Sequence, residues 1–155
     1  SVAETVEADP IYREIIEASR TRAMGSTAEA IMSAAREVAE TVNVKAICCF
    51  THSGTTALLA ARERPRVPIV ALTPFARTAR RLALVWGLHC TTVEEVERFK
   101  LAVVSAARVA KRDGFAVETD RIVVTAGVPF GVPGTTNILR VAAADERAIY
   151  EGEPA

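Results

Sequence analysis

Short apolar runs that alternate with helical patterns constrain this sequence more than any other feature. The runs at 45–50 and 68–73 are each followed by residues whose apolar positions recur with the period of a helix. We expect strands at 45–50, 68–73, 88–92, 122–126 and 137–142, and helices at 26–42, 54–63, 74–86 and 92–112. Strands and helices that alternate in this way are typical of βαβ units with a mostly parallel sheet.

The order of these elements also predicts the arrangement of the sheet. A near-continuous apolar strand such as 45–50 suits a sheet that helices cover on both faces. Because no helix separates the last two strands, we expect the fifth strand to run antiparallel. The first strand should be central, between the second and the fourth. In open α/β sheets, ligands bind outside the carboxyl ends of the strands at such a switch point.

Three of the predicted helices begin with capping signals. Ser26 and Glu29 fit a capping box, and so do Thr92 and Glu95. The pair Thr73-Pro74 provides an N-cap followed by proline at the first helical position, and that helix is expected to end before Gly87.

Length and composition indicate one globular domain with appendages. The chain has 155 residues, of which half are apolar and a quarter are charged. We interpret residues 1–25 as a linker or helical arm, 26–145 as the α/β domain, and 146–155 as a polar tail that frays. The sequence opens on Ser1, and we interpret it as a piece of a longer protein; removal of an initiator Met is the alternative.

Charge and cysteine content exclude several classes of partner. Nineteen basic and nineteen acidic residues give no net charge, which argues against nucleic acid or an anionic membrane as the main partner. No apolar run has the length needed to cross a bilayer, and no signal peptide is recognised. The odd set Cys48, Cys49 and Cys90 has no metal-site spacing and indicates a reducing, cytoplasmic compartment.

The first candidate loop lies where the first strand meets its helix, and it gathers hydroxyl groups around a glycine. Its residues are Thr51, His52, Ser53, Gly54, Thr55 and Thr56. A helix N-terminus favours an anion, because unpaired backbone N–H groups and the positive end of the dipole lie there. A phosphate-binding turn and plain helix capping explain the pattern equally well. The turn is neither a P-loop nor a dinucleotide fingerprint.

The second candidate loop joins the last two strands. Segment 125–137 holds three of the eight glycines and two of the seven prolines. Glycine lets backbone approach a ligand closely, and proline stiffens the path. Its candidate binding residues are Val128, Pro129, Phe130, Gly131, Val132, Pro133, Gly134 and Thr135. We expect both loops to flank one crevice.

The remaining polar side chains have mainly structural interpretations. His52 either donates to a phosphate or faces solvent, His89 is structural, and Trp86 belongs to the core or an interface. The basic residues Arg77, Arg80 and Arg81 form a solvated helix face that could also steer anions. The acidic residues Glu94, Glu95 and Glu97 match the dipole at a helix start. No complete catalytic or metal site is recognised.

Several motifs in order make the sequence resemble the C-terminal domain of pyruvate kinases. They occupy 34–41, 50–54, 68–74, 78–87, 123–129 and 134–137, and the resemblance covers roughly 26–143. It implies a three-layer αβα sandwich with a five-stranded, mostly parallel sheet whose last strand is antiparallel. It also implies that residues 1–25 connect to a catalytic barrel upstream.

The resemblance implies a role in regulation and in assembly of a tetramer. In this family the barrel transfers a phosphoryl group between phosphoenolpyruvate and ADP, giving pyruvate and ATP in the last step of glycolysis, with magnesium and potassium. The barrel's residues are absent from this sequence, so we expect no catalysis from this chain alone. Many members bind a phosphorylated effector at the loop that matches 51–56, and the loop that matches 128–135 closes over it.

Departures from the family pattern bear on the effector. Forms activated by fructose 1,6-bisphosphate hold the second phosphate with a Trp and an Arg, whereas segment 91–102 has no Trp and the Arg position falls near Ala102. His52 stands where some of those forms have lysine. A monophosphate such as AMP or a sugar monophosphate is therefore expected. A stand-alone module that binds a phosphorylated metabolite and a small phosphatase on this fold are the alternatives.

Overall fold

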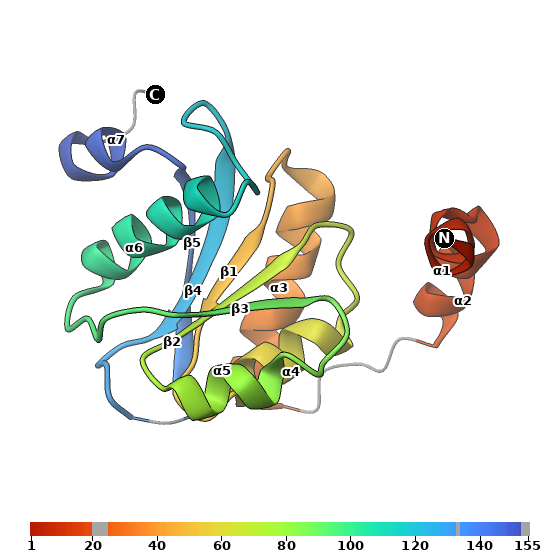
Figure 1. Cartoon of the computed structure of the whole chain (residues 1–155), viewed down its shortest axis with the longest axis horizontal. Helices are drawn as coiled ribbons and strands as arrows, with labels where there is room; N and C mark the ends of the chain where they lie inside the picture. The colour runs from red at the N-terminus through yellow and green to blue at the C-terminus, as the bar shows by residue number, and fades with distance from the viewer. Residues whose placement is uncertain (20–24, 133, 153–155) are drawn as a thin grey trace.

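The computed structural model describes residues 1–19, 25–132 and 134–152, and a five-stranded sheet lies at its centre (Figure 1). The strands are β1 Ile47–Phe50, β2 Ile69–Thr73, β3 Leu88–Thr92, β4 Arg121–Gly127 and β5 Thr136–Ala143. Their order is β3-β2-β1-β4-β5, with β5 antiparallel to β4 and the other pairs parallel. The predicted central position of the first strand and the reversed fifth strand are both confirmed.

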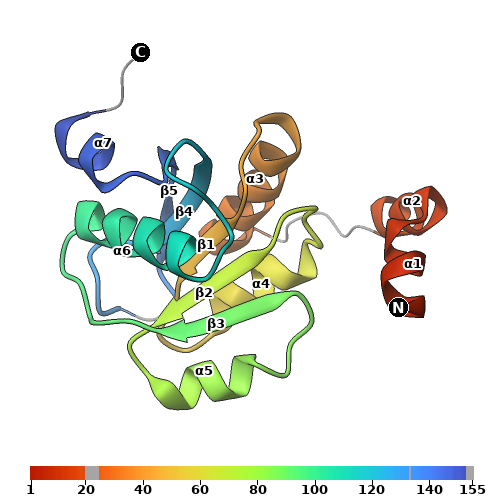
Figure 2. The same cartoon turned by 45° about the horizontal axis from the view of Figure 1, so that its top comes forward.

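Helices cover both faces of the sheet (Figure 2). One layer contains α3 Thr27–Thr41, α4 Thr55–Arg62 and α5 Ala76–Leu82, and the other contains α6 Phe99–Arg112 and α7 Glu146–Glu151. Successive side chains of a strand point to opposite faces, so Cys48 packs in the α6 layer and Cys49 in the α3 layer. The predicted three-layer αβα fold is confirmed.

Helix starts follow the capping signals at only one of the three predicted places. The Ser26 hydroxyl accepts a hydrogen bond from Glu29 N at 3.1 Å and caps α3. The cap predicted at Thr73 is wrong because Thr73 stays in β2, and its hydroxyl accepts from Phe75 N at 3.2 Å. Helix α5 therefore begins at Ala76, and it ends at Leu82, before the predicted end.

The start predicted for the last long helix is wrong by several residues. Val93 N donates to Thr73 O at 3.0 Å, which continues the pairing of β3 with β2 beyond Thr92. Backbone held in a sheet ladder cannot begin a helix at the same residue. Helix α6 consequently begins at Phe99.

The tail predicted to fray from residue 146 contains helix α7 instead. Asp145 caps it by accepting from Arg147 N at 3.0 Å. Ile149 is 2% exposed and packs in the hydrophobic core on the α6 face. The cap and the burial of this apolar side chain both favour the helix. The last three residues of the predicted tail lie outside the described residues.

The predicted N-terminal arm is helical in its described part, with α1 Val2–Ala8 and α2 Pro10–Ala18, and it lies beside the layers (Figure 1). Residues 20–24 of the arm lie outside the described ranges. Trp86 donates from Nε1 to Glu7 Oε1 at 2.8 Å, and the Arg64 guanidinium stacks 3.8 Å from the centre of its ring. Trp86 thus lies at the contact between arm and core.

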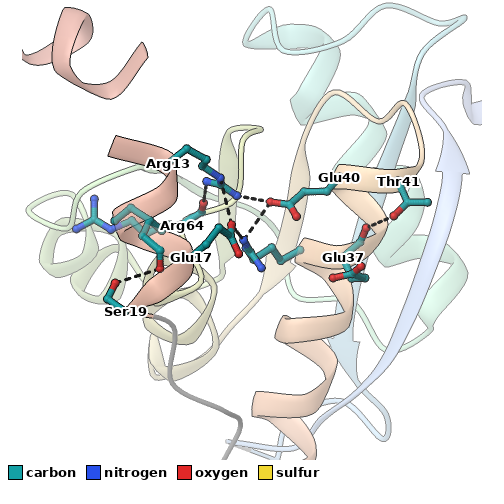
Figure 3. A network of polar contacts seen from close by, with 9 residues as sticks. Arg13, Glu17, Ser19, Glu37, Glu40, Thr41 and Arg64 are labelled. Carbon is teal, nitrogen blue, oxygen red and sulfur yellow. Dashed lines mark hydrogen bonds and ion pairs between the residues drawn. The ribbon is translucent and has the colours of Figure 1, made fainter. Parts of the chain in front are cut away.

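Ion pairs join α2 to α3 (Figure 3). Arg13 pairs with Glu40 of α3 and donates from Nη1 to Arg64 O at 2.6 Å. Arg36 of α3, which is 1% exposed, pairs with Glu17 of α2 and with Glu40 at 3.2 Å. A buried guanidinium needs such carboxylates, because an unpaired buried charge costs several kcal/mol, roughly 3–5.

Candidate anion-binding site

The turn after β1 is closed by its own polar groups. The Thr51 hydroxyl accepts from Gly54 N at 2.8 Å, and Thr51 is 7% exposed. Gly54 has φ +94°, and a Cβ there would lie 3.1 Å from Leu82 Cδ2 and 3.3 Å from Arg81 Nη2. Glycine is therefore required both by the backbone conformation and by the space.

The hydroxyl groups of this turn do not cap α4 as plain capping would require. The N-cap residue is Gly54, which offers no side chain, and the first turn of α4 holds no acidic residue. The Ser53 and Thr55 hydroxyls lie 3.0 Å apart, bonded to one another. The Ser53 hydroxyl also accepts from Thr55 N at 3.4 Å, so the hydroxyls of this turn bond to one another and to its backbone.

A cation approaches the same turn from α5. Arg81 donates from Nη2 to Ser53 O and packs against Gly54. A positive charge is unfavourable at a helix N-terminus unless an anion is also present. The solvated helix face predicted for Arg77, Arg80 and Arg81 is confirmed, since all three are exposed, but the contact of Arg81 with Ser53 was not predicted.

The second loop is clamped at its base. The Asn137 side chain accepts from Val128 N at 2.9 Å and donates to Val128 O at 2.7 Å. A Cβ on Gly127 would lie 2.6 Å from Thr135 Oγ1 and 2.8 Å from Thr135 O, so glycine lets the two ends of the loop meet. Pro133, one of the predicted binding residues, lies outside the described ranges.

The two loops meet across a small cavity. The hydroxyls of Thr56 and Thr136, 4% and 3% exposed, lie 2.7 Å apart. The Phe130 ring lies edge-on to Phe50, with 6.5 Å between ring centres. The cavity is about 30 Å³ and is lined by Phe50, Thr51, His52, Thr56, Gly127, Phe130, Gly131, Val132, Gly134, Thr135 and Thr136. That volume holds a water molecule, but not a metabolite.

His52 is held between three neighbours. Its backbone carbonyl accepts from the Thr78 hydroxyl at 2.9 Å, and its ring centre lies 5.6 Å from that of Phe75. Its Nε2 lies 3.5 Å from Glu95 Oε1, in the segment between β3 and α6. Sequence reasoning missed Glu95 at this site because it placed the residue in the first turn of a helix.

The described residues were compared with what a metal site and a reactive cysteine would require. Within them, no group of three His, Cys, Asp or Glu side chains is placed to hold a metal ion. Burial raises the pKa of Cys48, and it raises the pKa of Cys49 to about 12. Both thiols stay protonated near neutral pH. No helix in the described ranges is long and apolar enough to cross a membrane.

An α/β domain with a reversed fifth strand, and a hydroxyl-rich turn at its switch point, defines the class of this chain. A family model described as "Pyruvate kinase, alpha/beta domain" matches residues 29–142. The chain therefore belongs to the family of pyruvate kinase C-terminal α/β domains.

Relatives and solved structures agree with this assignment. A pyruvate kinase of Methylorubrum extorquens is 40% identical over 141 residues, covering 91% of this chain and 30% of the relative. One of Agrobacterium vitis is 39% identical over 140 residues, covering 90% and 30%. The structure of Cryptosporidium parvum pyruvate kinase in complex with ADP has a TM-score of 0.74 at 27% identity, covering 87% of this chain and 27% of that one. The chain thus spans about three tenths of the length of the curated relatives it matches.

Proposed function

We propose that this chain is the regulatory and assembly domain of a pyruvate kinase and binds a phosphorylated metabolite between turn 51–56 and loop 128–135. The observation that carries the proposal is the positive charge of Arg81 at the start of α4. The Arg81 guanidinium lies against that N-terminus, and the first turn of α4 has no acidic residue. A phosphate group would supply the missing negative charge and accept from the hydroxyls and backbone N–H groups there.

The cavity between the loops limits how the ligand enters. At about 30 Å³ it is too small for a metabolite, so a ligand that enters between Phe50 and Phe130 needs the tip of loop 128–135 to move outward. An adjoining pocket of about 530 Å³, beside Thr56 and Thr135, is accessible without that movement. The Asn137 clamp and the Thr56–Thr136 pair fix the base of the loop, so this movement is expected at the tip alone. The ligand we propose is a monophosphate, a sugar monophosphate or AMP.

The activity of the parent enzyme is a further part of the proposal. We infer phosphoryl transfer between phosphoenolpyruvate and ADP in a cytoplasmic, tetrameric glycolytic enzyme, with this chain supplying regulation and subunit contacts. Magnesium and potassium would serve that reaction. Among the described residues of this chain, no group of three His, Cys, Asp or Glu side chains is placed to hold either ion.

A thermal unfolding experiment tests the binding proposal. Fructose 6-phosphate, glucose 6-phosphate and AMP are added separately to the intact protein. A ligand present at one hundred times its Kd adds about 2.7 kcal/mol to the free energy of unfolding and raises the Tm. Absence of a shift with all three compounds at millimolar concentration would overturn the proposal.

Ser53 is the residue to vary, because its side chain is exposed and bonds only within the turn. Ser53→Ala should reduce the ligand-induced shift without lowering the Tm of the protein alone. Ser105→Ala on α6, on the other face of the sheet, is the matched control and should keep the full shift. Thr56→Ala would be ambiguous, because Thr56 is buried against Thr136 and its loss also weakens the fold.

A further inference from the structure

The candidate site has one anionic side chain of its own. Glu95 Oε1 lies 3.5 Å from His52 Nε2, and His52 lines the cavity between the loops. Contact with Phe75 and the hydrogen bond from Thr78 hold His52 in place, so its Nε2 meets the carboxylate instead of turning away. Turn 51–56 therefore carries a cation beside Ser53, from Arg81, and an anion beside His52, from Glu95.

We propose that Glu95 is a specificity-determining residue: it admits a ligand with a single phosphate and opposes one that brings a second anionic group next to His52. This inference rests on the proposed binding of a phosphorylated metabolite at the start of α4. A phosphate there compensates the charge of Arg81. A ligand that also placed a phosphate beside His52 would have to displace the Glu95 carboxylate or lie against it.

The neighbouring acids reinforce the direction of this effect. Glu94 and Glu97 lie in the same segment between β3 and α6 and are both exposed. Of the three acids in this described segment, Glu95 is the one that pairs with His52. Substitution of Glu94 therefore tests the effect of the segment's overall negative charge, and substitution of Glu95 tests the effect of its contact with His52.

The size of the effect follows from exposure. The Glu95 side chain is 63% exposed, so its repulsion of a phosphate is screened by water and salt. Interactions between exposed charges are weak, and a phosphate carries nearly two charges. Removing the carboxylate should therefore raise the affinity for a second phosphate about three- to ten-fold at low salt, and less at high salt.

The test compares two ligands that differ by one phosphate group. The Kd values of fructose 6-phosphate and fructose 1,6-bisphosphate are measured by titration calorimetry on the intact protein, at low and high ionic strength. The variants are Glu95→Gln, Glu95→Lys and the control Glu94→Gln. The quantity compared is the ratio of the two Kd values in each variant.

Glu95→Gln should shift this ratio about three- to ten-fold toward the bisphosphate, Glu95→Lys should shift it further, and Glu94→Gln should shift it little. An unchanged ratio in both Glu95 variants, or an equal shift in Glu94→Gln, would overturn the inference. If fructose 6-phosphate binds and Ser53→Ala weakens it while the ratio stays constant, only the role of Glu95 fails. If neither compound binds any variant, the specificity role fails together with the proposed site.

Discussion

The hydroxyl groups of Thr56 and Thr136 are bonded at 2.7 Å although eighty residues separate them in the sequence. Thr56 lies in the first turn of α4 and Thr136 begins β5, and each is almost fully buried. Thr56→Val or Thr136→Val alone leaves the other hydroxyl without this partner and should cost about 1–3 kcal/mol of stability. The double variant should cost less than the sum. Urea unfolding of the four proteins measures this, and strictly additive losses would show that the pair contributes no coupling.

Gly54 should resist substitution more strongly than a glycine with the same backbone conformation in open space. Gly54→Ala places a Cβ 3.1 Å from Leu82 and forces a non-glycine residue to φ +94°. Gly131, at φ +89°, has nothing within 4 Å of a Cβ and serves as the control. We expect Gly131→Ala to lose about 1 kcal/mol and Gly54→Ala about 2–4 kcal/mol. Equal losses in chemical denaturation would contradict the contact with Leu82.

Stability should depend on pH through Asp113, at the C-terminus of α6. The hydrogen bond from Arg112, and less strongly the one with His89, lower the pKa of Asp113 from its usual 3.8 to about 2. The ionised carboxylate therefore adds stability above pH 3.8, and this contribution is lost as the pH falls toward 2.

Asp113→Asn should consequently lower stability near neutral pH by about 1 kcal/mol, since its partner Arg112 is exposed and the pair is screened. The difference from the parent protein should shrink between pH 4 and pH 2. Glu118→Gln, whose side chain is 73% exposed, is the control and should change little. A difference that stays constant down to pH 2 would show that the charge of Asp113 is not its source.

The three thiols should react at very different rates in the folded protein. Burial raises the pKa values of all three thiols, but Cys90 on β3 is only partly buried, so a reagent can reach it in the folded protein. A thiol reagent at pH 8 should modify Cys90 first, and Cys48 and Cys49 only after unfolding. Cys90→Ser should remove the early reaction in a spectrophotometric thiol assay. Early labelling that persists in this variant would mean that a buried strand opens.

The sheet could be predicted from sequence because its signals are local. Each strand is an apolar run between turn residues, and the connection from β4 to β5 contains no helix, which fixes the reversed direction. The meeting of turn 51–56 with loop 128–135 followed from topology alone, since both extend from the same edge of the sheet. Tertiary contacts decided the rest.

The first residues of the helices, and the contacts made by long side chains, depend on tertiary contacts. The bond from Val93 N to Thr73 O keeps residues beyond β3 extended and overrides the capping box at Thr92. That error also removed Glu95 from the set of site residues. Arg81 is exposed as predicted, but its contact with Ser53 could not be predicted because the two residues lie far apart in the sequence.

The buried arginine of α3 has a consequence for any attempt to dissect this protein. Truncation near residue 25 would separate the arm from the α/β layers. Arg36 would then keep Glu40 but lose Glu17. The smallest unit that keeps its charges balanced therefore includes the arm. Ligand titrations on a trimmed protein would measure a scaffold in which Arg36 has lost one of its two carboxylates, in the helix whose first residues adjoin Thr56 and Thr135.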